Sequence, residues 1–82
     1  MDITRVAPQA DFQLVLTFAS GEERSFDMRP LLAMKPWCRI AAPALFMKAH
    51  VDYGTVVWPG EIDMAPETLL LDSVPMLGSV AV

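Results

Sequence analysis

Residues 51–71 read VDYGTVVWPGEIDMAPETLLL, and this stretch says more about the fold than any other part of the chain. Tyr53 and Gly54 predict a tight turn between two short strands, because glycine tolerates the positive φ that such turns need. The WPG sequence at 58–60 predicts a corner. Pro66 predicts the first turn of a helix, where a missing N–H costs nothing. The stretch therefore defines a backbone path, and it contains no recognisable catalytic motif.

Upstream of this stretch, residues 12–18 alternate apolar and polar side chains, the period-two pattern of a strand with one buried face. A turn at Gly21 and a returning strand over 25–28 complete a predicted hairpin. A preceding strand is predicted over 3–6, ended by Pro8.

Prolines also predict where short helical turns begin. Pro30 and Pro43 each suit a first helical turn, and Pro36 stops the first of these turns. Such short helices are marginal alone and must pack on a sheet. The predicted order is strand-strand-strand, helix-helix, strand-strand, helix. Short connections favour antiparallel pairing, so we expect an α+β fold with one small, mainly antiparallel sheet and short helices on one face.

Length and composition predict a single domain that associates with other chains. The 82 residues suffice for one core, which we place in residues 1–72. Residues 73–82 form an apolar tail that is expected either to fray or to pack on a neighbouring chain. Hydrophobic residues make up 54% of the chain, more than a small core hides. The surplus predicts a homo-oligomer, with a dimer favoured.

The charges are segregated along the chain, whose net charge is −4. All six basic residues precede His50, and only acidic ones follow it. An acidic C-terminal third repels a phosphate backbone, so direct nucleic-acid binding is not expected. It suits a small basic protein partner, although a solvated acidic face is the simpler interpretation. The acidic residues concerned are Asp52, Glu61, Asp63, Glu67 and Asp72.

The sequence favours a cytoplasmic protein. Its lone cysteine, Cys38, excludes an internal disulfide and suits a reducing compartment. No apolar run reaches the roughly 18 residues of a membrane span, and the first residues lack a signal-peptide pattern. We therefore expect no membrane association.

Few residues offer chemistry. Cys38 and His50 are the only thiol and imidazole, too few for a transition-metal site and with nothing to pair them as nucleophile and base. The carboxylates Asp52, Asp63 and Glu67 leave open a small enzyme or ligand-binding domain, which requires at least two of them to meet in a pocket. The alternative is that Asp52 and Asp63 bond backbone groups near the turns. We expect no enzyme activity, metal or cofactor.

Three aromatic residues are candidates for partner binding: Trp37, Tyr53 and Trp58. Aromatic side chains are enriched at interface hot spots, but they also fill small cores. For Trp58, inside a predicted strand, the core role is favoured. Trp37 lies in a loop with scattered basic residues, too sparse a patch for nucleic acid.

Over residues 3–71, the order of glycine, proline, aromatic and acidic residues resembles an uncharacterised family of small bacterial proteins, domain of unknown function 2442. The residues that carry the resemblance are Phe18, Gly21-Glu22, Phe26-Asp27, Pro30-Leu31-Leu32, Phe46, Val51-Asp52, Gly54-Thr55, Trp58-Pro59, Asp63, Pro66-Glu67 and Leu69. The resemblance implies a small α+β domain with no established activity, so it supplies no functional residues.

The same resemblance suggests what kind of role this chain has. Some relatives carry an added helix-turn-helix DNA-binding domain, for which these residues leave no room. Such proteins are also similar to the small partners of two-gene modules, which implies an antitoxin-like or regulatory role. The leading hypothesis is thus a non-enzymatic protein-interaction module. The sensor half of a split transcriptional regulator is a further alternative.

Overall fold

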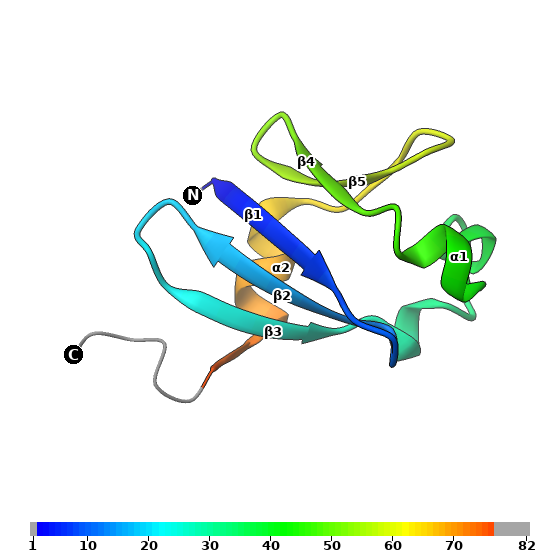
Figure 1. Cartoon of the computed structure of the whole chain (residues 1–82), viewed down its shortest axis with the longest axis horizontal. Coiled ribbons are helices and arrows are strands. Elements are labelled where there is room, and N and C mark those ends of the chain that lie inside the picture. Colours follow the sequence, from blue (N-terminus) through cyan, green and yellow to red (C-terminus); the bar gives the residue numbers. More distant parts are fainter. Residues whose placement is uncertain (1, 77–82) are drawn as a thin grey trace.

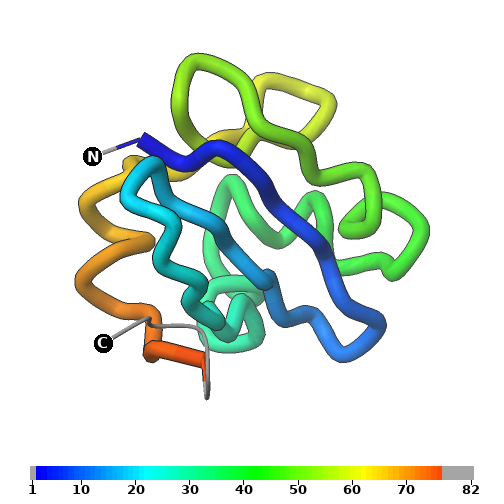
Figure 2. The backbone as a smooth tube through the Cα atoms, turned by 60° about the vertical axis from the view of Figure 1, so that its left-hand side comes forward, coloured from blue at the N-terminus to red at the C-terminus, as the bar shows by residue number. Residues whose placement is uncertain are grey.

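A computed structural model describes residues 2–76 and shows a mixed α+β fold with two antiparallel sheets (Figures 1 and 2). The larger sheet has the order β1-β2-β3-β7, with β1 at Ile3–Pro8, β2 at Gln13–Phe18, β3 at Glu23–Asp27 and β7 at Val74–Pro75. The smaller has the order β4-β5-β6, with β4 at His50–Asp52, β5 at Thr55–Trp58 and β6 at Ile62–Asp63. The helical elements are the 3-10 turns η1 (Arg29–Leu31) and η2 (Trp37–Ile40) and the helices α1 (Pro43–Phe46) and α2 (Pro66–Asp72).

The prediction of a single sheet is wrong, because β4, β5 and β6 pair only with one another. The two sheets meet at β1, where the Ile3 N–H donates to the Gly54 carbonyl at 2.9 Å. Figure 1 shows the β4–β5 hairpin beside β1 but turned away from its direction. The β4–β5 and β5–β6 pairs use the backbone groups of these strands on one another, and β1 already pairs along its length with β2. The pattern of the sequence indicates strands, and it does not say which strands pair.

The β2–β3 hairpin follows the predicted alternation. Leu14, Leu16 and Phe18 are buried, and Leu14 lies opposite Phe26 in the register. The turn that joins the strands contains Gly21 with φ +92, a backbone conformation that glycine adopts without steric cost. The apolar face of this hairpin is one wall of the core.

Both sheets and the helices share one core, in which Trp58 is the largest fully buried side chain. Its indole N–H donates to the Phe46 carbonyl at 3.0 Å, so the polar atom of the ring is satisfied. The Phe46 ring also contacts Phe12, with centroids 5.1 Å apart, and lies 6.0 Å from the Trp58 ring. These contacts tie the smaller sheet and α1 to the β1–β2 turn.

The C-terminal part of α2 leads into a short edge strand. Ser73 is buried, and Val74 pairs with Ser25 of β3. Arg24 donates to the Ser73 hydroxyl at 2.6 Å and to its carbonyl at 2.8 Å, and also bonds Glu22. Residues 74–76, predicted to belong to a tail, thus join the edge of the larger sheet, and Ser73 ends α2. The rest of that tail lies outside the described residues.

Pro75 bears on how this sheet ends. The Met76 N–H donates to the Glu23 carbonyl, so Glu23 and Ser25 direct their backbone groups towards β7. By alternation, the nitrogen of Pro75 lies on the outer side of β7, where it has no hydrogen to offer to another strand. Proline at such a position discourages further strand addition.

No helix within residues 2–76 is long and apolar enough to cross a bilayer.

Candidate functional site

The three predicted aromatic candidates do not form one surface. Trp58 is fully buried and offers no contact area to a partner. Tyr53 is 93% exposed at the tip of the β4–β5 turn, where it adopts a φ of 53°. Trp37 is half-buried in η2, and its indole N–H has no hydrogen-bond partner among residues 2–76. Of the three, Tyr53 is the side chain that solvent reaches most fully.

The three candidate carboxylates lie on separate elements, and all are exposed. Asp52 ends β4 and Asp63 ends β6, with β5 between these strands, while Glu67 is in the first turn of α2. None of them lines the pocket described below. Within residues 2–76, no group of three or more His, Cys, Asp or Glu side chains is placed to hold a metal ion. Cys38 and His50 are both exposed, and the His50 ring lies within hydrogen-bond distance of the Lys48 carbonyl.

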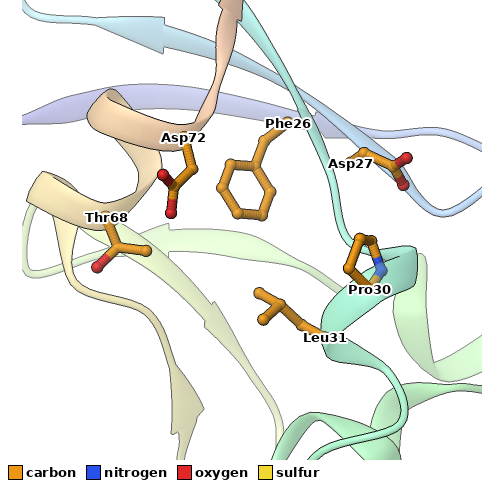
Figure 3. A pocket seen from close by; sticks show the side chains of 6 residues that line it. All are labelled: Phe26, Asp27, Pro30, Leu31, Thr68 and Asp72. Carbon is orange, nitrogen blue, oxygen red and sulfur yellow. The ribbon is translucent and has the colours of Figure 1, made fainter.

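A half-open pocket of about 310 Å³ lies between the end of β3, η1 and α2 (Figure 3). We call it the α2 pocket. Its lining residues are Phe26, Asp27, Pro30, Leu31, Thr68 and Asp72. Figure 3 shows the Thr68 methyl group and the Asp72 carboxylate on the α2 side, facing the Phe26 ring and Leu31, while the Asp27 carboxylate points away. The pocket thus has an apolar floor and a polar rim.

The β3–η1 side of the pocket is shaped by Asp27. Its Oδ1 accepts the backbone N–H of Arg29 at 3.0 Å, which fixes the bend at which η1 begins. The Arg29 guanidinium donates to both carboxylate oxygens, from Nε to Oδ1 at 2.9 Å and from Nη2 to Oδ2 at 2.8 Å. The hydrogen bonds from the Arg29 side chain, and to a lesser extent the one from its backbone N–H, lower the pKa of Asp27. The same side-chain bonds raise the pKa of Arg29. Asp27 is therefore an ionised carboxylate whose charge is balanced by Arg29.

The other side is one face of α2. Pro66 begins this helix, and Leu69 anchors it in the core. Thr68 and Asp72 are four residues apart, so both lie on the face that borders the pocket. The Ser73 hydroxyl donates to the Leu70 carbonyl at 3.1 Å, where the helix ends. Leu71, 79% exposed, adds apolar surface next to Asp72.

The uncompensated charge at the α2 pocket is negative. Asp27 is paired with Arg29, and Arg24, further along β3, is engaged by Glu22 and Ser73. In the described part of the chain, no ion pair involves Asp72. A half-open pocket with an apolar floor and one free carboxylate suits a guest with an apolar body and a cationic end.

Sequence reasoning missed this pocket, because its two sides come from segments far apart in the chain. Two local signals were present. Asp27 lies two residues before Arg29, and Thr68 lies four residues before Asp72 beside the core residue Leu69. Neither signal says that the end of β3 faces α2.

Comparison with known proteins identifies a family and nothing more specific. A search of curated proteins and a search of solved structures each found no significant match. A family model described as protein of unknown function (DUF2442) matches residues 3–74. That range spans both sheets and α2, in agreement with the resemblance drawn from the sequence. The chain therefore belongs to this family of proteins of unknown function.

Proposed function

We propose that this chain is a non-enzymatic protein-interaction module that binds a small basic protein. The observation that carries the proposal is the state of the acidic residues after His50. All five are exposed, and within residues 2–76 none takes part in an ion pair. Unpaired carboxylates on a surface speed association with a basic partner and disfavour association with an acidic partner.

Exposed apolar side chains supply the second requirement of an interface. Tyr53 is 93% exposed on the smaller sheet, while Leu71 is 79% and Val74 60% exposed around the end of α2. A large aromatic side chain surrounded by polar groups is typical of an interface hot spot. The exposed carboxylates therefore lie on elements that also expose apolar surface.

The biological role that fits this arrangement is antitoxin-like or regulatory, with the chain acting by binding its partner. That role rests on the analogy with small partners of two-gene modules. We also propose that the chain forms a dimer, because Met34, Leu45 and Met47 expose further apolar surface around the η1–α1 segment. The mass in solution, measured by light scattering, tests the dimer separately from the basic partner.

The test of the proposed function is isolation of the tagged chain at native levels from its own cells, then reconstitution with the co-purifying protein. We expect a stoichiometric complex with a basic protein, weakened as salt rises from about 50 to 500 mM. The E61Q/E67Q variant removes two of the unpaired charges, and affinity is expected to fall about 3- to 10-fold. The D2N/D11N variant, which removes two acidic residues before His50, is the matched control.

The outcomes separate the hypotheses. A chain that purifies without any stoichiometric companion, or a complex indifferent to salt and to E61Q/E67Q, would contradict the proposal. A partner with a DNA-binding domain would instead favour the sensor half of a split transcriptional regulator.

A further inference from the structure

We propose that the α2 pocket receives one lysine or arginine side chain of the partner. The aliphatic stem lies against Phe26, Pro30 and Leu31, and the cationic end lies at the Asp72 carboxylate. The inference rests on the proposed function, which it deepens by naming the group that is recognised.

The size of the pocket supports a single side chain. Its volume of about 310 Å³ lies at the lower limit of small-molecule sites, and it is half open. A nucleotide or similar cofactor needs more room, and it also needs basic or backbone donors for its phosphates. None of the lining residues is basic, and Arg29, next to Pro30 in the chain, is already bonded to both oxygens of Asp27.

The chemistry of the walls selects the kind of side chain. Phe26, Pro30 and Leu31 offer carbon surface, and a lysine or arginine stem packs on such surface while its charged head stays at the rim. Figure 3 shows the methyl group of Thr68 directed towards the pocket, which adds to the carbon surface. A neutral aliphatic side chain fits the floor but leaves the Asp72 carboxylate unused, and an acidic one is repelled by it.

The position of Asp72 is unfavourable for the free chain. It occupies the last turn of α2, where the helix dipole disfavours a negative charge, and no basic residue occupies that turn. Residues that conflict with local rules are commonly found at functional sites. A cation bound at this end of the helix interacts favourably both with the carboxylate and with the last carbonyl groups of α2.

The inference is tested with side-chain mimics on the ¹⁵N-labelled full chain. n-Butylammonium and n-butylguanidinium are titrated at neutral pH and constant ionic strength, with 1-pentanol and pentanoate as neutral and anionic mimics. We expect millimolar binding by the two cations, as for any guest of this size. The shifted amide signals should be those of Phe26, Leu31, Thr68 and Asp72. Pentanol should bind at least 5-fold more weakly, and pentanoate should not bind.

The variant D72N makes the test specific. It should weaken binding of both cations at least 5-fold, while its midpoint in urea should stay equal or rise slightly, because a charge is removed from the helix end. D63N, which removes an exposed carboxylate on β6 outside the pocket, should bind the cations as the native chain does. A loss of fold would instead lower the midpoint and move signals throughout the spectrum.

Three results would overturn the inference: no cation-induced shifts, shifts centred outside the α2 pocket, or equal binding of cations and pentanol. Retention of binding by D72N would do the same. Failure here differs from failure of the proposed function. A salt-sensitive complex with a basic protein that D72N leaves unchanged would keep the function and reject the pocket as its contact. Specific binding of the mimics without any basic partner would retain the pocket and reject the function.

Discussion

The two sheets of this small protein are held in place in different ways. The larger sheet has strands of five to six residues in β1, β2 and β3, and a regular alternation buries one face of β2. The smaller sheet has strands of two to four residues, joined by turns in which Tyr53, Gly54, Gly60 and Glu61 all have positive φ. The larger sheet is stabilised along its length, whereas the smaller depends on a few anchors.

Trp58 is the chief anchor of the smaller sheet, since its buried ring reaches the Phe46 carbonyl of α1. The larger sheet has a polar side-chain contact of its own, between Arg24 and Ser73, at the edge where β7 pairs with β3. Strands as short as those of the smaller sheet therefore need side-chain anchors in the core, because their own backbone bonds are too few.

Trp58→Ala should be the most damaging change. It removes a large core side chain and leaves the Phe46 carbonyl without its partner, so we expect a loss of about 3–5 kcal/mol in the free energy of unfolding. Trp58→Phe keeps much of the volume and should cost about 1–3 kcal/mol. Urea denaturation measures both. Val57→Ala, at a half-buried neighbour on β5, is the control and should cost less than either.

The contrast between the sheets fails if Trp58→Ala costs no more than Val57→Ala. In that case the smaller sheet would be stabilised along its backbone as the larger one is.

Arg24→Ala should have an intermediate effect. The half-buried guanidinium makes two bonds to Ser73 and one to Glu22, so its loss should cost about 1–3 kcal/mol. Hydrogen exchange should rise first at β7, and the β1–β2 pair should stay protected. Arg29→Ala is the matched control, because its ion pair is exposed and should contribute little to stability. Equal costs for the two arginine variants would show that the Ser73 contact does not fasten the edge.

A pair of glycine substitutions compares one turn from each sheet. Gly21 and Gly60 have φ of +92 and +94, so alanine should cost about 1–2 kcal/mol at each. A Cβ at Gly60 would also lie 2.9 Å from the Arg39 guanidinium, while nothing lies near Gly21. The end of an arginine side chain moves aside easily, so the two costs should agree within about 0.5 kcal/mol. Thermal denaturation measures both, and a clearly larger cost at Gly60 would make Arg39 a second anchor of the smaller sheet.

The smallest effect concerns the pH dependence contributed by Asp27. Because hydrogen bonds from Arg29 lower the pKa of Asp27 in the folded chain, its contribution is fully present above the unfolded pKa of about 3.9 and is lost as the pH falls through the lower folded value. D27N should therefore be slightly less stable than the native chain at neutral pH, and the difference should shrink in acid. Urea denaturation from about pH 2.5 to 7 follows this difference. A difference that grows in acid would contradict the assignment.

Much of the local structure could be predicted from particular residues. The alternation through Leu14, Leu16 and Phe18 marked β2, and Pro43 and Pro66 marked the first residues of α1 and α2. These signals act over a few residues, where backbone sterics and periodicity decide the outcome. The pairing of β4–β6 into a separate sheet could not be predicted in the same way, because strand pairing depends on contacts between distant segments.

The candidate site shows the same limit. The aromatic residues Trp37, Tyr53 and Trp58 were recognisable as candidates, but only the fold separates the buried Trp58 from the exposed Tyr53. The α2 pocket was not foreseen, since the segments that carry Phe26 and Asp72 meet only in the folded chain.

By itself, the sequence determined the family, the α+β class, the turns and helix start within residues 51–71 and an acidic C-terminal third without a single Lys or Arg. Those properties are local or additive, so they can be read in order along the chain. The tertiary structure decided that the strands form two sheets, that Trp58 is the anchor of the smaller one and that Asp72 stands free at a pocket. These outcomes depend on which distant surfaces bury one another, a choice made by the packing of the whole core.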